Sequence, residues 1–146
     1  MSAPTLFAPD WAQAVREAVD RGPDDDVRAG KLPTYWEWID NARAPHDGVW
    51  ALVATDLPAH LLLEWEQGRC TRAEIAGPDD VATASYVLAA PLAVWQELRD
   101  GADAGRLVMY RRIRLERGDV LAFFRMIYFV VEALAAIGRV PARQAA

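Results

Sequence analysis

The feature that most constrains this chain is its last long apolar run, which extends from Val120 to Ile137 and contains only two charged side chains. Gly118-Asp119 precede the run and Gly138 follows it, so the sequence predicts one long helix over residues 120–137. Arg125 and Glu132 are seven residues apart, nearly two helical turns, and therefore lie on one narrow stripe of this helix.

The predicted helix is apolar on more than one side. Facing away from its two charges is a seam at core spacing, formed by Phe123, Ile127, Val130, Leu134 and Ile137. Leu121, Tyr128 and Phe129 flank the charges on the outer side, where we expect cover by the core, a second subunit, a ligand or a partner protein. A membrane span is disfavoured, because the run is barely long enough and contains both charges.

Length and composition indicate a soluble globular protein with one domain over residues 1–146. Sixteen basic and twenty-one acidic side chains give a formal charge of −5, which argues against nucleic-acid binding. The first residues lack the basic and apolar segments of a signal peptide, and the single cysteine, Cys70, suits a reducing compartment. We therefore expect a cytoplasmic location.

Ahead of the last run, the sequence predicts a helix and then strands. Trp11 to Val19 has an apolar stripe at helical spacing, and Gly22-Pro23 end this predicted helix. Tyr35–Asp40 is predicted to form a second, short helix. Gln67-Gly68 has the length of a hairpin turn. Four segments with strand patterns follow one another as a predicted meander: Val49–Thr55, His60–Glu66, Arg69–Ala76 and Val81–Leu88.

The remaining elements complete an α+β pattern. Pro91 begins a helix that turns Trp95 inward, Asp103 caps a further short helix, and Arg111–Leu115 alternates as a fifth strand. This order predicts a mainly antiparallel sheet of about five strands, covered by helices on one face. Because the late strand follows a helical crossover, it can pair parallel to one member of the sheet.

Catalytic or metal-binding constellations are missing from the sequence pattern. Cys70 is interpreted as a small packed residue, and His46 and His60 lack the spacing of a zinc site or a triad. The one acid–base pair that the pattern allows, His60 with Glu64 on one strand face, is the type of pair that is commonly just solvated. We therefore expect no catalytic residue, no metal ligand and no cofactor.

The late part of the chain is basic inside an acidic protein. Its arginines are Arg106, Arg111, Arg112, Arg114, Arg117 and Arg125. Arg112 and Arg114 share one face of the predicted fifth strand, and guanidinium groups suit the carboxylate or phosphate of an amphiphile. The alternative is a solvated strand face balanced by Glu116 and Asp119.

Several local strings, in this order, resemble the sterol carrier protein 2 (SCP2) sterol-binding domain, in its small stand-alone bacterial form. The similarity begins at Phe7-Ala8-Pro9-Asp10-Trp11 and continues to the end of the last predicted helix. The most telling string, from Ala84 to Trp95, matches the family's strand, small-residue turn and helix with an inward tryptophan. The segment Tyr35 to His46 is longer and more aromatic than in the family, and suits either a lid or a core plug.

The resemblance implies an apolar tunnel between the sheet and the late helices, which would hold a fatty acyl chain, a sterol-like molecule or another lipid. Large or pliable apolar residues are the expected lining: Trp36, Trp38, Trp65, Trp95, Met109, Phe123, Met126, Ile127, Val130 and Leu134. Arg112 and Arg114 are the expected partners of the head group.

Three functions remain open from the sequence. The first is non-enzymatic binding or transfer of a hydrophobic small molecule. The second is a small enzyme acting on an apolar substrate in the same cavity, with His60, Tyr86 or Tyr128 as proton-transfer groups. The third is an accessory subunit that docks on a larger enzyme, or a homodimer, through the C-terminal helix.

Overall fold

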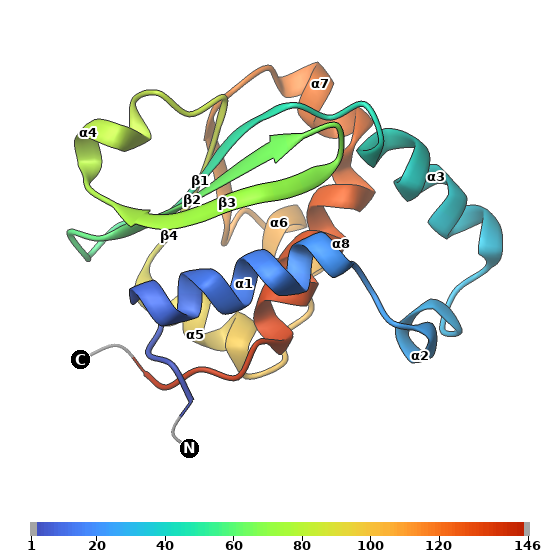
Figure 1. Ribbon diagram of the computed structural model, residues 1–146. Helices are drawn as coiled ribbons and strands as arrows, with labels where there is room; N and C mark the ends of the chain where they lie inside the picture. The colour runs from blue at the N-terminus through green and yellow to red at the C-terminus, as the bar shows by residue number, and fades with distance from the viewer. Residues whose placement is uncertain (1–2, 145–146) are drawn as a thin grey trace.

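The computed structural model of the protein describes residues 3–144 as an α+β fold around one five-stranded sheet (Figure 1). The strands are β1 (Gly48–Ala54), β2 (His60–Glu66), β3 (Arg69–Ala76), β4 (Tyr86–Ala90) and β5 (Arg114–Arg117). The helices are α1 (Pro9–Arg21), α2 (Asp25–Arg28), α3 (Pro33–Arg43), α4 (Pro78–Val81), α5 (Leu92–Arg99), α6 (Ala104–Met109), α7 (Val120–Arg125) and α8 (Ile127–Arg139).

The β2–β3 hairpin has the bounds that the sequence predicts. Gln67 and Gly68 both adopt positive φ, 47° and 78°, which is the backbone of the tight turn that suits the twist of a hairpin. A bulge between Glu64 and Trp65 shifts the register of the pair. As a result, His60 lies opposite Ala76, one residue further along β3 than a hairpin without the bulge would place it.

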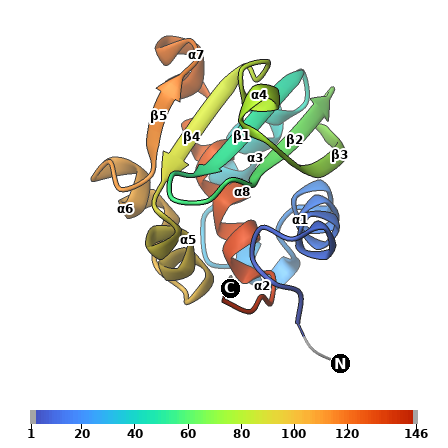
Figure 2. The ribbon, with the colours of Figure 1, turned by 90° about the vertical axis from the view of Figure 1, so that its left-hand side faces the viewer.

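The predicted four-strand meander is wrong, because the chain leaves the sheet after β3. Pro78 begins the short helix α4, which ends at Val81, where the fourth strand was predicted to begin. The Asp80 carboxylate accepts a hydrogen bond from Gly77 N at 3.3 Å. The chain then returns as β4, which pairs parallel to β1, and β5 pairs antiparallel to β4. The order is β3-β2-β1-β4-β5 (Figure 2), and three of its four pairings are antiparallel, which confirms the mainly antiparallel sheet.

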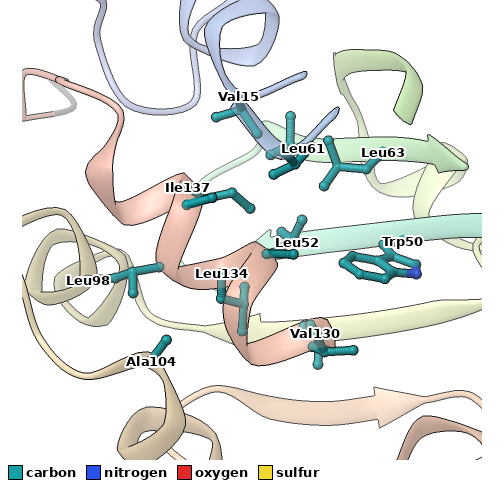
Figure 3. Close-up of a cluster of buried hydrophobic side chains, with 14 of the residues drawn as sticks. Val15, Trp50, Leu52, Leu61, Leu63, Leu98, Ala104, Val130, Leu134 and Ile137 are labelled. Carbon is teal, nitrogen blue, oxygen red and sulfur yellow. The ribbon is translucent and has the colours of Figure 1, made fainter. Parts of the chain in front are cut away.

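The main core lies between the sheet and α8, with α1, α5 and α6 closing its sides (Figure 3). Leu61 and Leu63 of β2, two positions apart and so on one face of the strand, point into this core and are fully buried. They face the apolar side of α8, where Leu134 and Ile137 are buried. Each such side chain removed from water contributes roughly 1.5–3 kcal/mol, so this layer positions α8 under the sheet.

The predicted long C-terminal helix is two helices. At Met126 the backbone has φ −112° and ψ 21°, which ends α7 before α8 begins. The break lets each helix follow a different part of the sheet. Phe123 in α7 packs on Tyr86 of β4, with ring centres 6.0 Å apart, whereas Phe129 in α8 packs on β1 and β2.

The burial of α7 and α8 follows the predicted seam but extends beyond it. Four of the five seam residues are buried, and Ile127 is partly buried. On the predicted outer side, Leu121 and Tyr128 are exposed, but the placement of Phe129 there is wrong. Phe129 is buried because α8 contacts α1 and α3 as well as the sheet, and is therefore covered over a wide arc.

A partly buried carboxylate joins α1 to the sheet and to α3. Asp20 accepts hydrogen bonds from Arg69 Nε at 2.8 Å and from Cys70 N at 3.0 Å. Its own backbone oxygen accepts from Arg43 of α3 at 2.7 Å. The hydrogen bond from Arg69 holds the pKa of Asp20 below its ordinary value of 3.8.

We predict that Asp20→Asn lowers the free energy of unfolding near neutral pH by about 1–3 kcal/mol, because charged hydrogen bonds are lost. Since the pKa of Asp20 is lowered in the folded state, its stabilisation is full above about pH 4 and disappears as the pH falls through the folded-state pKa. Urea unfolding of the parent protein and of Asp20→Asn at several pH values is the measurement, and the two free energies of unfolding should converge as the pH falls. Asp40→Asn, at an exposed ion pair with Arg28, is the control with little effect. A deficit in Asp20→Asn that stays constant into strong acid would contradict the account.

Candidate functional site

Three aromatic rings fill the space between α8 and the strands β1 and β2. Trp50 of β1, Trp65 of β2 and Phe129 of α8 are all buried. Their ring centres are 4.8, 5.3 and 5.2 Å apart in the three pairs. At this place the structure has packed side chains where the resemblance implies a tunnel.

His46 and Arg43 close one side of this aromatic cluster. His46 Nε2 accepts a hydrogen bond from Trp50 Nε1 at 2.9 Å, so its ring is neutral with its proton on Nδ1. Burial lowers the pKa of His46, which favours the same neutral form. The Arg43 guanidinium lies 5.7 Å from the ring centre of Trp65 and 5.9 Å from that of Phe129, and its Nε donates to Gly68 O.

Since the interior is filled, the largely apolar hollow lies on the outer side of α8. We call it the α3–α8 groove; it runs between α3 and the junction of α7 with α8 and has a volume of about 480 Å³. Its lining consists of Trp38, Ile39, Asn41, Ala42, Phe124, Arg125, Met126, Tyr128 and Phe129. Seven of these nine side chains are aromatic or aliphatic.

A hydrogen bond and a cation fix the start of α3 against α8. The Tyr35 hydroxyl donates to Glu132 Oε2 at 2.7 Å, and Lys31 Nζ lies 3.8 Å from the same oxygen. Lys31 also lies over the Tyr35 ring, 4.4 Å from its centre. Burial and the Glu132 carboxylate raise the pKa of Tyr35, so its hydroxyl remains a donor. One wall of the groove is therefore held at a set distance from the other.

Two aromatic rings border the groove at the solvent. Trp38 is 68% exposed and Tyr128 is 49% exposed, and their rings stack at 6.1 Å with an interplanar angle of 23°. The groove continues along α3 into a wider, open hollow of about 820 Å³, which shares Trp38 and Asn41 with it and reaches Leu32. Large apolar surfaces that stay in water are the mark of a binding site.

Two solved structures share the fold over nearly the whole chain. The crystal structure of sterol carrier protein 2 matches with a TM-score of 0.71 and 22% identity, over 93% of this chain and 99% of the other. The solution structure of a conserved hypothetical protein from Thermus thermophilus, suggested to be a sterol carrier protein, matches with a TM-score of 0.69 and 22% identity, over 98% and 94%. The fold is that of sterol carrier protein 2.

The SCP2-like fold confirms the resemblance seen in the sequence. No family model matches the chain, and no curated protein matches its sequence. At 22% identity the two structures establish the fold alone, so the ligand has to be argued from the groove.

The structure divides the predicted ligand-binding residues of the SCP2-like chain between the core and the surface. Trp38 and Met126 line the α3–α8 groove, and Ile127 is half-buried and packs against the core. The other buried members pack in the core: Trp36, Trp65, Trp95, Phe123, Val130 and Leu134. The expectation that Met109 lies in the interior is wrong, because α6 turns Leu107 inward and leaves Met109 79% exposed.

Arg112 and Arg114 do not share a strand face. The strand β5 begins at Arg114, and Arg112 lies before it, where its guanidinium pairs with both oxygens of Glu97. Arg114 is 3.3 Å from Glu116, as in the solvated alternative. The arginine that lines the groove is Arg125, at the end of α7.

Sequence reasoning marked Tyr128 and Phe129 through the apolar excess on the outer side of the last run. It missed five other lining residues: Ile39, Asn41, Ala42, Phe124 and Arg125. The aromatic segment Tyr35 to His46 contributes to the core, as the plug interpretation predicts, and also to the surface. Trp36 and Ile39 are buried in the core, and Trp38 forms the exposed wall of the groove.

The cysteine and both histidines lie outside the groove. The Cys70 thiol is buried, which raises its pKa to about 11. His60 lies with Leu62 on the sheet face that α4 covers, and burial lowers its pKa. Within residues 3–144 no three His, Cys, Asp or Glu side chains gather to hold a metal ion. Over the same residues, no helix has both the length and the apolar character to cross a membrane.

We predict that Phe129→Ala lowers the free energy of unfolding by about 3–5 kcal/mol, because it empties an aromatic site between Trp50 and Trp65. Tyr128→Ala, next to it in sequence but half-exposed, is the matched control and should cost clearly less. Urea unfolding of the two variants and the parent protein measures the difference. If Tyr128→Ala costs more than Phe129→Ala, the orientation of α8 described here is wrong.

Proposed function

We propose that this protein binds an elongated apolar small molecule, such as a fatty acyl chain, in the α3–α8 groove and carries it without changing it chemically. The observation that supports this most strongly is the groove itself, with about 480 Å³ of space and seven apolar side chains among its nine lining residues. Sites for small molecules are concave, mostly apolar and commonly 300–1,000 Å³ in volume.

The shape of the hollow favours a chain-like ligand. The groove and the wider hollow beside it share Trp38 and Asn41, so one continuous surface follows α3 from Phe124 to Leu32. The helix α3 has eleven residues and is therefore about 16 Å long, close to the length of an extended acyl chain. A ligand lying there would cover the exposed faces of Trp38 and Tyr128, which now contact water.

A cation at the end of the groove suits an acidic head group. Arg125 is exposed at the last turn of α7, and no carboxylate of residues 3–144 lies within ion-pair distance of it. A guanidinium can take both oxygens of a carboxylate or phosphate. Asn41, on the opposite wall, adds a donor and an acceptor.

A carrier accounts for these residues better than an enzyme does. Of the three proton-transfer groups suggested by the sequence, only Tyr128 lines the groove, and neither His60 nor Tyr86 does. Arg125 and Asn41 are binding groups and not a general base. The SCP2-like fold supports a carrier too, since the crystal structure that it matches is of a protein named a sterol carrier.

The test is the binding of a fluorescent fatty acid by Trp38→Ala. Removing the exposed wall of the groove should weaken binding about tenfold or more, which corresponds to roughly 1.4 kcal/mol, and leave the melting temperature nearly unchanged. Tyr110→Ala removes a similarly exposed aromatic ring from the end of α6, outside the groove, and should bind like the parent protein. A parent protein that binds no fatty acid, or a Trp38→Ala variant that binds as well as the parent, overturns the proposal.

A further inference from the structure

The positive charge of the chain is concentrated in the segment from Ala104 to Arg125. This segment has six arginines and only two carboxylates, Glu116 and Asp119, so its formal charge is +4 in a chain whose total is −5. All six arginines are exposed. Within residues 3–144, no carboxylate lies within ion-pair distance of Arg106, Arg111 or Arg117.

The fold places this segment along one edge of the molecule. The strand β5 is the last of the sheet, α6 precedes it and α7 follows it. Figure 2 shows the three elements one above another, on the side of the sheet far from α1. We call this surface, formed by residues 106–121, the basic edge.

Large apolar side chains stand out from both ends of the basic edge. Met109 and Tyr110, at the end of α6, are 79% and 75% exposed, and Leu121, at the start of α7, is 71% exposed. Chain segments on a lipid surface show the same combination, with apolar side chains that enter the boundary between head groups and acyl chains and basic side chains that meet lipid phosphates.

The backbone holds Met109 and Tyr110 outward. Arg111, next to them, adopts φ 59°, which is uncommon for a residue other than glycine. Leu107 O accepts hydrogen bonds from Arg112 N at 2.8 Å and from Ile113 N at 2.9 Å, and the Ile113 side chain is buried. The turn is thus fixed from inside, and its exposed tip is a built feature of the fold.

We propose that the basic edge docks the protein on a lipid surface that contains anionic head groups. The exposed arginines supply the attraction to lipid phosphate, and Met109, Tyr110 and Leu121 supply the apolar contact. A second copy of this chain is the less favoured occupant, because two basic edges, each with five arginines and two carboxylates and so a formal charge of +3, repel each other. The inference depends on this surface alone and stands whether or not the groove holds a ligand.

The test is co-sedimentation of the full chain with lipid vesicles. The parent protein should sediment with vesicles that contain phosphatidylcholine and phosphatidylglycerol, remain in solution with vesicles of phosphatidylcholine alone, and be released by salt. The double variant Arg111→Gln/Arg117→Gln should bind the anionic vesicles about tenfold or more weakly. The matched control is Arg21→Gln/Arg139→Gln, which removes the same charge from exposed arginines away from the basic edge and should bind like the parent.

Two further variants distinguish the apolar contribution to vesicle binding from ligand binding in the groove. Met109→Ser/Tyr110→Ser should weaken vesicle binding without changing fatty-acid binding, and Trp38→Ala should do the reverse. Equal sedimentation with both kinds of vesicle, no sedimentation with either, or equal weakening by the two arginine variants overturns the proposal. So does a dimer of the parent protein that Arg111→Gln/Arg117→Gln dissociates, because the occupant of the basic edge is then a second copy.

Discussion

The contact on which the rest of the structure depends is that of Phe129 with Trp50 and Trp65. It fixes α8 to β1 and β2, and the same rings support His46 and Arg43, which hold the end of α3. Because three rings fill the space between α8 and the strands β1 and β2, the apolar hollow lies between α3 and the α7–α8 junction. The break between α7 and α8 at Met126 belongs to the same arrangement, since it lets the two helices pack on different strands.

Local patterns predicted much of this fold, and non-local pairing did not follow from them. The bounds of β2 and β3 and the inward sides of Leu61, Leu63 and Trp95 depend on short periodicities that the sequence contains. The parallel pairing of β4 with β1 depends on where a short helix carries the chain, which periodicity does not encode. The burial of Phe129 likewise depends on α1, α3 and the sheet meeting α8 at once.

The candidate site shows the same division. An excess of apolar surface on the last run and an excess of arginines were visible in the sequence, but their partners come from elsewhere in the chain. Arg112 pairs with Glu97 of α5, and Arg125 faces the wall that α3 provides. The helix α7 connects the two proposed surfaces, because Phe124 and Arg125 line the α3–α8 groove and Leu121 belongs to the basic edge. Under our proposals, a protein docked through this edge would hold one end of its groove beside the lipid.

The central claim, that an acyl chain lies in the α3–α8 groove and not between α8 and the sheet, is tested most directly by a nitroxide-labelled fatty acid. The chain has six tryptophans, whose indole N–H resonances report on separate places in the fold. Trp38 lies in the groove, and Trp50 and Trp65 lie in the filled interior. Trp95 Nε1 donates hydrogen bonds to Val53 O and Ala90 O, near the opposite end of β1. The account predicts that the bound label broadens the Trp38 resonance most and leaves that of Trp95 sharp. A sharp Trp38 resonance, with those of Trp50 and Trp65 broadened, would contradict it.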